Sequence, residues 1–471
     1  MAPTRRRVLQ ALGAASVATL AGCSSDSDGG AADGGNGSDD QPVDQPTSGD
    51  GGNGSSAGSG AGTEPQSPEA AARQLVQHLF AGEFEAGQAL FVEAYQSRAT
   101  PAILERLRLG CNAAGGAFQG IGAVETSVRS GLDAVDLTLR LERTTAPFRV
   151  SVTQEHRIQG AVIAGEYEPA TYADPARFDA TDHTLEPGGC QLGATVTRPA
   201  DTEQAPGVVL VHGSGPSDRD LTVGANKPYR DLAEGLASRG IAVLRYEKRS
   251  HACNVPAAEH TVDRVTVEDA LHAISWFRSR DGVAADDVTV VGHSLGAMMA
   301  PQIANTDGDV AGVVGLAAPA RPLEDVFLDQ IDHLADVGDH TPAGIDQQRS
   351  QWQRAAEQIR SGTYENDESL LGYPGAFWRS LDGYDPVDTA ADVGVHQHYF
   401  QGGRDYQVTV ADDFAAWQRA FGDGESVALS AYDPLNHAFL PGQGPSVPQA
   451  YAVPNQVSES VVVDLASWLQ N

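Results

Sequence analysis

The fold is decided by the stretch Val288-Thr-Val-Val-Gly292-His-Ser294-Leu-Gly296-Ala-Met-Met-Ala-Pro-Gln-Ile-Ala304. A short β-branched run leads into Gly-His-Ser-Leu-Gly, and an Ala/Met-rich helical pattern follows. This order predicts a strand, a sharp turn and a helix, with Ser294 in the turn. In a G-x-S-x-G nucleophile elbow the serine occupies such a strained turn. Gly292 and Gly296 lack Cβ atoms, so the strand and the helix can approach closely there. The hydroxyl would then face the helix N-terminus, which favours developing negative charge.

The same five residues also fit a glycine-rich turn with an exposed, inert Ser294. Glycine and serine are common, so the pattern alone has little specificity. The strand before it and the helix after it favour the elbow, because this context is what supports the motif. The partner residues elsewhere in the chain decide between the two interpretations.

The chain has a strong excess of acidic residues. Its 471 residues carry 31 Lys+Arg against 63 Asp+Glu, a formal net charge of −32, and its only lysines are Lys227 and Lys248. This balance argues against nucleic-acid binding through phosphates. The Asp/Glu excess and the scarcity of lysine resemble proteins from extreme halophiles, which we favour over an ordinary acidic secreted protein.

The N-terminus has the layout of an export signal, with a basic region, a short apolar region and small residues. The apolar region is too short for a spanning helix. Thr4-Arg-Arg-Arg-Val-Leu9 resembles a twin-arginine signal. Leu20-Ala-Gly-Cys23 resembles a lipobox, which implies that Cys23 is lipidated. We therefore expect a signal peptide over residues 1–23 and a protein that is exported, extracytoplasmic and anchored to the cell membrane by lipid. A simple cleaved signal and a plain basic N-terminus are the alternatives.

Residues 24–67 consist of small and polar residues with almost no large apolar side chain. Such a segment cannot bury enough surface to fold, so we expect a flexible tether between the anchor and a globular part.

The four cysteines are Cys23, Cys111, Cys190 and Cys253. If Cys23 carries lipid, three remain and at least one is unpaired. The sequence has no C-x-x-C pair and no His/Cys spacing suited to zinc, so we expect neither a metal nor a cofactor. We interpret the three remaining cysteines as buried free thiols.

Residues 68–167 predict a small α+β domain. Helical patterns cover residues 68–114, and from Ala117 the hydrophobic period changes to two, which indicates strands up to Tyr167. Helices followed by a curved antiparallel sheet resemble the small cystatin-like, nuclear-transport-factor-like domains found ahead of some secreted hydrolases. We favour a structural role for this segment over substrate access or partner contact.

Residues 168–471 alternate strands with helices, which predicts a doubly wound, mostly parallel sheet. Gly207-Val-Val-Leu-Val-His212 is a continuous apolar run, as expected of a parallel strand buried on both faces. The loop after it, beginning His212-Gly-Ser214, is where hydrolases with an elbow place a second oxyanion-hole N–H. We expect the oxyanion hole to consist of the backbone N–H groups of Ser214 and Leu295. The alternative is a Gly/Pro turn with no role.

Several motifs in this part follow the order found in one group of enzymes. They are His212-Gly-Ser-Gly-Pro-Ser-Asp-Arg-Asp220, Ile241-Ala-Val-Leu-Arg-Tyr-Glu-Lys-Arg249, Gly292-His-Ser-Leu-Gly296, Ala317-Ala-Pro-Ala-Arg-Pro-Leu-Glu324 and Leu435-Asn-His-Ala-Phe-Leu-Pro-Gly442. Together they resemble the α/β-hydrolase carboxylesterases related to dienelactone hydrolases and serine aminopeptidases. The glycine after the elbow is often paired in that group, whereas Ala297 follows Gly296 here. The resemblance covers roughly residues 185–471 and implies an α/β-hydrolase fold and ester hydrolysis.

An insert over about residues 321–395 separates the elbow from the last strands. Helical patterns at Leu323–Leu334, Gly344–Ile359 and Glu368–Leu381, together with five aromatic residues, predict a helical cap. Inserts at this point commonly cover the active site. A packing subdomain without substrate contact is the alternative.

The remaining members of a catalytic triad are expected after the last strands. Asp405 follows a strand in a Gly-rich turn, and His437 follows the final strand. The order Ser294, Asp405, His437 is that of α/β-hydrolases. Asp382 and Asp385 precede the strand, and His396 and His398 lie within it, so they are weaker candidates.

These residues predict a serine hydrolase that cleaves small-molecule carboxylic esters through an acyl-enzyme on Ser294. A serine aminopeptidase would need a carboxylate cluster for the substrate amine, which we do not identify. An acyltransferase on the same scaffold and a catalytically silent binding module remain alternatives. The sequence does not define the oligomeric state.

Overall fold

The computed structural model describes residues 64–471 except 423 and 425. The expected signal peptide, the lipidation site Cys23 and nearly all of the tether lie outside the described residues. None of the helices between residue 64 and the C-terminus has the length and apolar character needed to cross a membrane.

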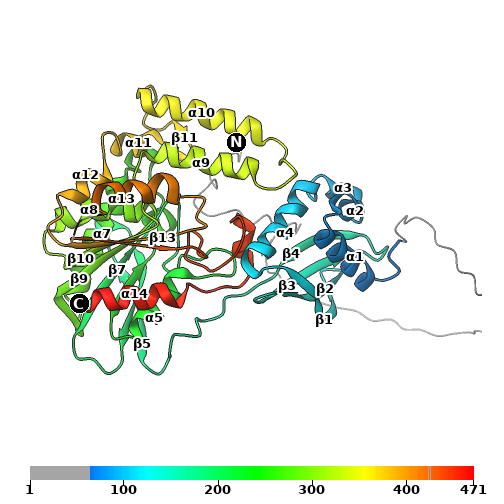
Figure 1. Cartoon of the computed structure of the whole chain (residues 1–471), viewed down its shortest axis with the longest axis horizontal. Helices are drawn as coiled ribbons and strands as arrows, with labels where there is room; N and C mark the ends of the chain where they lie inside the picture. Colours follow the sequence, from blue (N-terminus) through cyan, green and yellow to red (C-terminus); the bar gives the residue numbers. More distant parts are fainter. Residues whose placement is uncertain (1–63, 423, 425) are drawn as a thin grey trace, which may run out of the picture.

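The larger part of the molecule is built on an eight-stranded sheet (Figure 1). Its strands are β5 (Phe178–Leu185), β6 (Leu192–Pro199), β7 (Ala205–Val211), β8 (Ala242–Tyr246), β9 (Val283–His293), β10 (Gly312–Leu316), β13 (His396–Gly402) and β14 (Val427–Tyr432). They run in the order β14-β13-β10-β9-β7-β8-β6-β5. The six strands from β14 to β8 are parallel, and β6 and β5 are antiparallel at one edge. This is the mostly parallel sheet of an α/β-hydrolase fold, as predicted.

Helices bury both faces of this sheet, which explains the continuous apolar runs of its strands. Val208 and Leu210 of β7 belong to one cluster with α5 (Pro228–Ala237) and α14 (Glu459–Leu469). Val209 and Val211 belong to another cluster with α7 (Glu268–Arg278) and α8 (Leu295–Asp307). Successive residues of one strand thus pack on opposite layers of helices. The shorter helices of this part are α6 (Arg249–Ala252), α13 (Ala415–Phe421), η1 (Pro187–Gly189), η2 (Ala257–Glu259), η3 (Asp263–Val267), η4 (Val410–Phe414) and η5 (Pro448–Ala452).

The first domain places its helices on one antiparallel sheet, the α+β layout expected for this segment (Figure 1). The helices are α1 (Pro68–Ala81), α2 (Phe84–Ala89), α3 (Glu93–Gln96) and α4 (Pro101–Gly115). The strands β1 (Phe118–Arg129), β2 (Leu132–Leu141), β3 (Thr145–Val152) and β4 (Ile158–Ile163) pair in chain order. Ala450, Ala452 and Val453 of the second part complete the core of this domain. Its likeness to cystatin-like domains stays a prediction.

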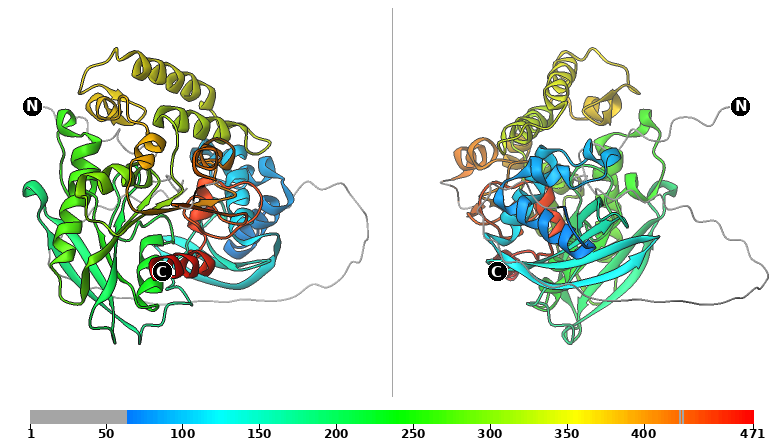
Figure 2. Two further views of the ribbon diagram at one scale, coloured as in Figure 1. Left: turned by 60° about the vertical axis from the view of Figure 1, so that its left-hand side comes forward. Right: turned by 90° about the vertical axis from the view of Figure 1, so that its right-hand side faces the viewer.

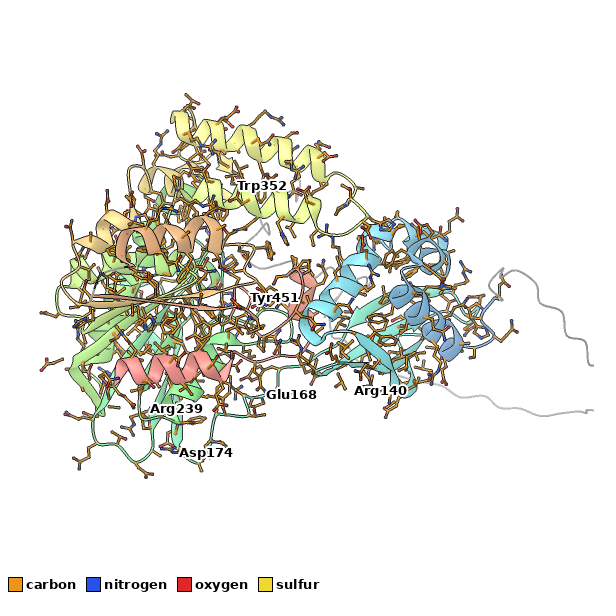
Figure 3. The ribbon with its side chains drawn as sticks, in the orientation of Figure 1. Arg140, Glu168, Asp174, Arg239, Trp352 and Tyr451 are labelled. Atoms are coloured by element: carbon orange, nitrogen blue, oxygen red, sulfur yellow. A yellow bond between two sulfur atoms is a disulfide. The ribbon has the colours of Figure 1, made fainter. Side chains whose placement is uncertain are left out.

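The insert forms a cap that lies at one end of the molecule in all views (Figures 1 and 2). It contains α9 (Leu323–Asp336), α10 (Ile345–Ser361), β11 (Ser369–Leu370), β12 (Tyr373–Pro374), α11 (Gly375–Ser380) and α12 (Pro386–Ala391). Trp352 of α10 lies between the two long cap helices, with its ring centroid 6.4 Å from that of Phe327 (Figure 3).

The expectation of one helix over Glu368–Leu381 is wrong for its first half. There the chain forms the hairpin of β11 and β12, and α11 begins only at Gly375. Leu371 and Gly372 have φ values of 47° and 84°. Two successive positive φ values fit a tight hairpin turn and are incompatible with a helix.

The expectation of free thiols at Cys190 and Cys253 is also wrong, because these two residues form a disulfide across 63 residues of sequence. Cys111 is free and buried, as expected. Burial raises the pKa of the Cys111 thiol to about 12, which keeps it protonated and unreactive.

Candidate active site

Ser294 stands between the end of β9 and the start of α8, in a backbone conformation with φ 55° and ψ −121°. Non-glycine residues rarely adopt a positive φ, so the turn is strained and its surroundings must hold it. The Ser294 N–H donates to Leu316 O at 2.9 Å. A Cβ at Gly292 would lie 2.2 Å from Gly296 O, and one at Gly296 would lie 2.3 Å from Val211 O. The two glycines are therefore required for the close approach of strand and helix.

Asp405 and His437 are brought together by neighbouring parallel strands. Asp405 follows β13, His437 follows β14, and the carboxyl ends of the two strands lie side by side. His437 Nδ1 lies 2.7 Å from Asp405 Oδ2, and both side chains are buried. The other carboxylate oxygen accepts the N–H groups of Gln407 at 2.8 Å and Val408 at 3.1 Å. These bonds fix the carboxylate so that it accepts the Nδ1 proton, which leaves Nε2 as the basic nitrogen.

The alternative acids and histidines lie in other environments. Asp385 accepts the N–H groups of Val387 and Asp388 and so caps α12. His398 bonds the Ser430 hydroxyl through Nε2 at 2.9 Å, and His396 is exposed. None of these bonds leads to Ser294, so Asp405 and His437 are the better candidates.

His293, the residue before the serine, supports the loop of His437. Its Nε2 donates to His437 O at 2.9 Å, and the two ring centroids are 4.6 Å apart. Burial and the neighbouring His437 ring lower the pKa of His293 to about 3. His293 is therefore neutral and adds no positive charge beside the candidate base.

The loop that carries Ser214 packs directly on the elbow. A Cβ at Gly213 would lie 2.9 Å from Ser294 Cβ, so this position also requires glycine. Ser214 lies in a loop, and no backbone carbonyl in the described part of the chain accepts its N–H. Leu295 is the first residue of α8, and its N–H has no partner within the helix. Both N–H groups are thus free to bind an oxyanion.

One cavity joins these groups. It has a volume of about 90 Å³ and is lined by Ser214, Ser294 and His437. Its apolar walls come from α9 of the cap and from the segment around η5, and they include Leu323, Val326, Phe327, Leu334, Pro448 and Tyr451. Tyr451 lies between the eight-stranded sheet and the first domain (Figure 3). A serine, a histidine that a buried carboxylate orients, and the loop of Ser214 meet at one partly apolar cavity, an arrangement that can carry out acyl transfer from a small substrate.

Comparison with known proteins gives the family. The chain matches the alpha/beta hydrolase family over residues 208–452. It is also 33% identical over 399 residues to esterase EstD of Thermotoga maritima, which covers 84% of this chain and 93% of the relative. The chain belongs to the alpha/beta hydrolase family. It is an esterase-type hydrolase. The match to EstD covers 84% of this chain, whereas residues 168–471 make up less than two thirds of it. The match therefore extends into the first domain.

Two solved structures are similar to this hydrolase at low identity. The esterase Pf2001 of Pyrococcus furiosus has 15% identity and a TM-score of 0.40, covering 66% of this chain and 95% of that chain. Est1E of Butyrivibrio proteoclasticus has 13% identity and a TM-score of 0.40, covering 61% of this chain and 98% of that chain.

Two residues of the hydrolase site were not singled out from the sequence. Lys248 is buried, and its ammonium donates to Gly213 O in the loop that carries Ser214. The Tyr373 hydroxyl, from β12 of the cap, accepts the N–H of Gly215 in the same loop. The sequence could have pointed to Lys248 only through the scarcity of lysine, since Lys248 is one of two lysines in the chain. Tyr373 had no signal beyond its place in an aromatic-rich insert.

No cluster of three or more histidine, cysteine or carboxylate side chains suited to a metal occurs in the described residues.

Proposed function

We propose that this hydrolase cleaves small carboxylic esters through an acyl-enzyme on Ser294. The observation that carries the proposal is the 2.7 Å contact between His437 Nδ1 and Asp405 Oδ2 beside the cavity that Ser294 and His437 both line. Relatives described as esterases support the ester as the substrate class.

In the proposed reaction His437 Nε2 takes the Ser294 proton while Oγ attacks the ester carbonyl carbon. The tetrahedral oxyanion accepts hydrogen bonds from the N–H groups of Ser214 and Leu295. His437 then gives its proton to the departing alcohol, which leaves the acyl group on Ser294. Water, deprotonated by the same histidine, attacks the acyl carbonyl and releases the carboxylic acid. Asp405 holds the imidazole in the tautomer that this sequence needs and stabilises the imidazolium.

The first experiment measures hydrolysis of p-nitrophenyl esters from acetyl to long-chain acyl in high salt, with an aminoacyl-p-nitroanilide panel alongside. We expect ester cleavage with an optimum at short acyl groups, because the cavity is small. Anilide cleavage alone would favour the aminopeptidase. Product analysis with added alcohols or amines distinguishes an acyltransferase from a hydrolase.

Matched serine variants test the nucleophile. Ser294→Ala should abolish turnover and labelling by a fluorophosphonate, whereas the exposed Ser279→Ala should keep both. Asp405→Asn should lower kcat by about 10⁴-fold, because the imidazole then adopts the wrong tautomer. If folded Ser294→Ala retains wild-type activity, the acyl-enzyme proposal is wrong. A folded wild type that is not labelled at all would favour the silent binding module.

We also propose that the protein is exported and held at the membrane surface by lipid on Cys23. The twin-arginine-like and lipobox-like motifs carry this proposal. The disulfide between Cys190 and Cys253 supports it, because disulfides persist mainly in oxidising compartments. Partition of the wild type into detergent, lost in Cys23→Ala, is the expected result. Equal partition of the two proteins would contradict the lipid anchor.

The acidic composition further supports a halophilic protein. With a net charge of −32, folding should require molar salt, because salt screens the self-repulsion of the folded state. Circular dichroism during stepwise dilution of salt tests this, and full stability in dilute buffer would contradict it.

A further inference from the structure

Lys248 lies directly beneath the oxyanion loop. The loop follows β7 and Lys248 follows β8, and these parallel strands are neighbours, so their carboxyl ends meet at one edge of the sheet. Lys248 is 3% exposed, and its ammonium donates to Gly213 O. None of the ion pairs among the described residues includes Lys248. A buried ammonium without a counter-ion is costly, and the hydrogen bond to this carbonyl offsets part of that cost.

The carbonyl of Gly213 and the N–H of Ser214 belong to the same peptide group. A cation on the carbonyl oxygen draws electron density from the amide and makes the N–H a stronger donor, as in polarised hydrogen-bond chains. It also fixes the plane of the peptide, so that the N–H keeps its direction toward the cavity. We propose that Lys248 is a positioning residue, which orients and polarises the Gly213–Ser214 peptide for oxyanion binding. This inference rests on the proposed esterase function.

The loop is held from its other side as well. The Tyr373 hydroxyl accepts the Gly215 N–H. Burial raises the pKa of Tyr373 to about 12, although a hydrogen bond with the Ser214 side chain opposes this, so the phenol stays neutral. Gly213 has no room to turn, because a Cβ there would meet Ser294 and His293. Lys248 therefore acts on a peptide whose neighbours are already fixed.

The charge of Lys248 depends on the groups around it. These are Asp269 of α7, His212 directly after β7 and His260 after η2, and Arg249 of α6 is the next residue in the chain. Asp269 accepts two hydrogen bonds from the Arg249 guanidinium, so the positive charge of Arg249 largely neutralises its negative charge. Burial lowers the pKa of His212 and of His260 to about 4, and both are neutral at pH 7. Burial lowers the pKa of Lys248 itself to about 7, with Asp269 opposing.

The pKa of Lys248 sets the direction of the expected pH effect. Below pH 7 the ammonium is charged and polarises the peptide, and above pH 7 it becomes a neutral amine. We therefore expect kcat to fall on the alkaline side of neutrality, with little change in KM, because the oxyanion exists only after the substrate has bound.

The test compares kcat and KM from pH 5.5 to 9 for wild type, Lys248→Gln, Lys248→Arg and Lys227→Gln. Lys227 is the matched control, since its ammonium pairs with Asp220 at 2.9 Å and forms no hydrogen bond with the Gly213–Ser214 peptide. Lys248→Gln keeps a donor without charge, and we expect kcat to fall about tenfold at pH 6.5, less than the loss of a whole oxyanion donor. Lys248→Arg keeps the charge at every pH, so it should retain the rate and lose the alkaline decline.

The outcomes separate this inference from the proposed function. Absence of ester turnover and of Ser294 labelling in wild type would remove the function itself. Active wild type with Lys248→Gln equal to Lys227→Gln would overturn only the role of Lys248. If Lys248→Gln does not fold, Lys248→Met, which also removes the charge, takes its place, and a kcat at pH 6.5 equal to that of Lys227→Gln contradicts the inference.

Discussion

The buried carboxylate of Glu105 accepts the backbone N–H of His340 at 2.7 Å, although the two residues are 235 positions apart. Glu105 belongs to α4 of the first domain, and His340 lies in the loop between α9 and α10 of the cap. The same carboxylate accepts the Asp339 N–H at 3.0 Å. Burial alone would raise the pKa of Glu105, but these hydrogen bonds outweigh it and lower the pKa below its usual value. The first domain therefore holds the cap through an ionised side chain.

Two further contacts extend this support to the walls of the cavity. Arg106 donates to Leu334 O at 2.6 Å, and Leu334 lines the cavity. A Cβ at Gly110 of α4 would lie 2.6 Å from the backbone of Gln449, so α4 packs closely on the segment that carries Tyr451. The first domain thus supports both apolar walls, although none of its residues lines the cavity.

Glu105→Gln should loosen the cap. The glutamine amide would present N–H donors to the N–H groups of Asp339 and His340, and an unsatisfied buried donor costs about 1–3 kcal/mol. Hydrogen exchange of the amides at residues 337–343 should become about 5- to 150-fold faster, which is the same free energy expressed as an opening equilibrium. Glu93→Gln, an exposed carboxylate of the same domain, is the control for the change in charge. Unchanged exchange in the cap loop of Glu105→Gln would show that the bonds do not hold the cap.

Removal of the disulfide should destabilise the hydrolase domain. For a crosslink over 63 residues, the loss of chain entropy in the unfolded state corresponds to about 4 kcal/mol. Cys190→Ser, Cys253→Ser and the double variant should lose similar free energies of unfolding, because each breaks the same bond. Denaturant titration in high salt measures this. A double variant that loses the sum of the two single variants would mean that the cysteines act separately.

Truncation of a cavity wall should change acyl-chain preference. Leu334 is half-buried and lines the cavity, so Leu334→Ala removes three carbon atoms there without opening the main core. We expect the p-nitrophenyl ester optimum to move to longer acyl groups, and each additional buried CH₂ to contribute about 0.8 kcal/mol. Leu328→Ala is the matched control, since Leu328 is half-buried on the same helix and does not line the cavity. The same shift in both variants would indicate a general loosening of the cap.

The sequence predicts the local parts of the site well. Gly292, Ser294 and Gly296 stand within five residues, and the turn that they form needs only that short stretch. Asp405 and His437 follow strands whose buried, apolar character is visible in the sequence, and parallel strands bring their ends to one edge of the sheet. The motif order thus suffices to predict the α/β-hydrolase fold and to nominate the triad.

The long-range contacts have no such local signal. Lys248 and Gly213 are 35 residues apart, and Tyr373 is 158 residues from Gly215. Their bonds depend on which strands are neighbours and on how the cap lies on the sheet. A spacing argument likewise could not pair Cys190 with Cys253, because connectivity depends on the folded geometry. The predicted helix over Glu368–Leu381 was wrong in its first half because the aromatic residues fit an amphipathic period, whereas Leu371 and Gly372 form a turn.

The buried histidines should make the fold sensitive to acid. Burial lowers the pKa of His212 to about 4 and that of His293 to about 3, whereas histidine in an unfolded chain has a pKa of about 6.5. Between these values the unfolded chain binds a proton that the folded protein does not. Stability therefore falls as the pH drops below 6.5, by about 2 kcal/mol per histidine at pH 5. Asp231 acts in the opposite direction, because burial raises its pKa to about 6 and the folded protein binds that proton more readily.

A difference measurement isolates one histidine from Asp231 and the other groups. The free energy of unfolding of wild type minus that of His212→Gln should decrease by about 2 kcal/mol from pH 7 to pH 5. Only wild type has the His212 ring, which takes up a proton in the unfolded chain but stays neutral in the folded protein. Urea titrations at each pH, all in the same high salt, provide these free energies at constant ionic strength. His396→Gln, at an exposed ring, is the control for the loss of a histidine that is not buried. A constant difference for His212→Gln would mean that His212 takes up its proton equally well in the folded and unfolded states.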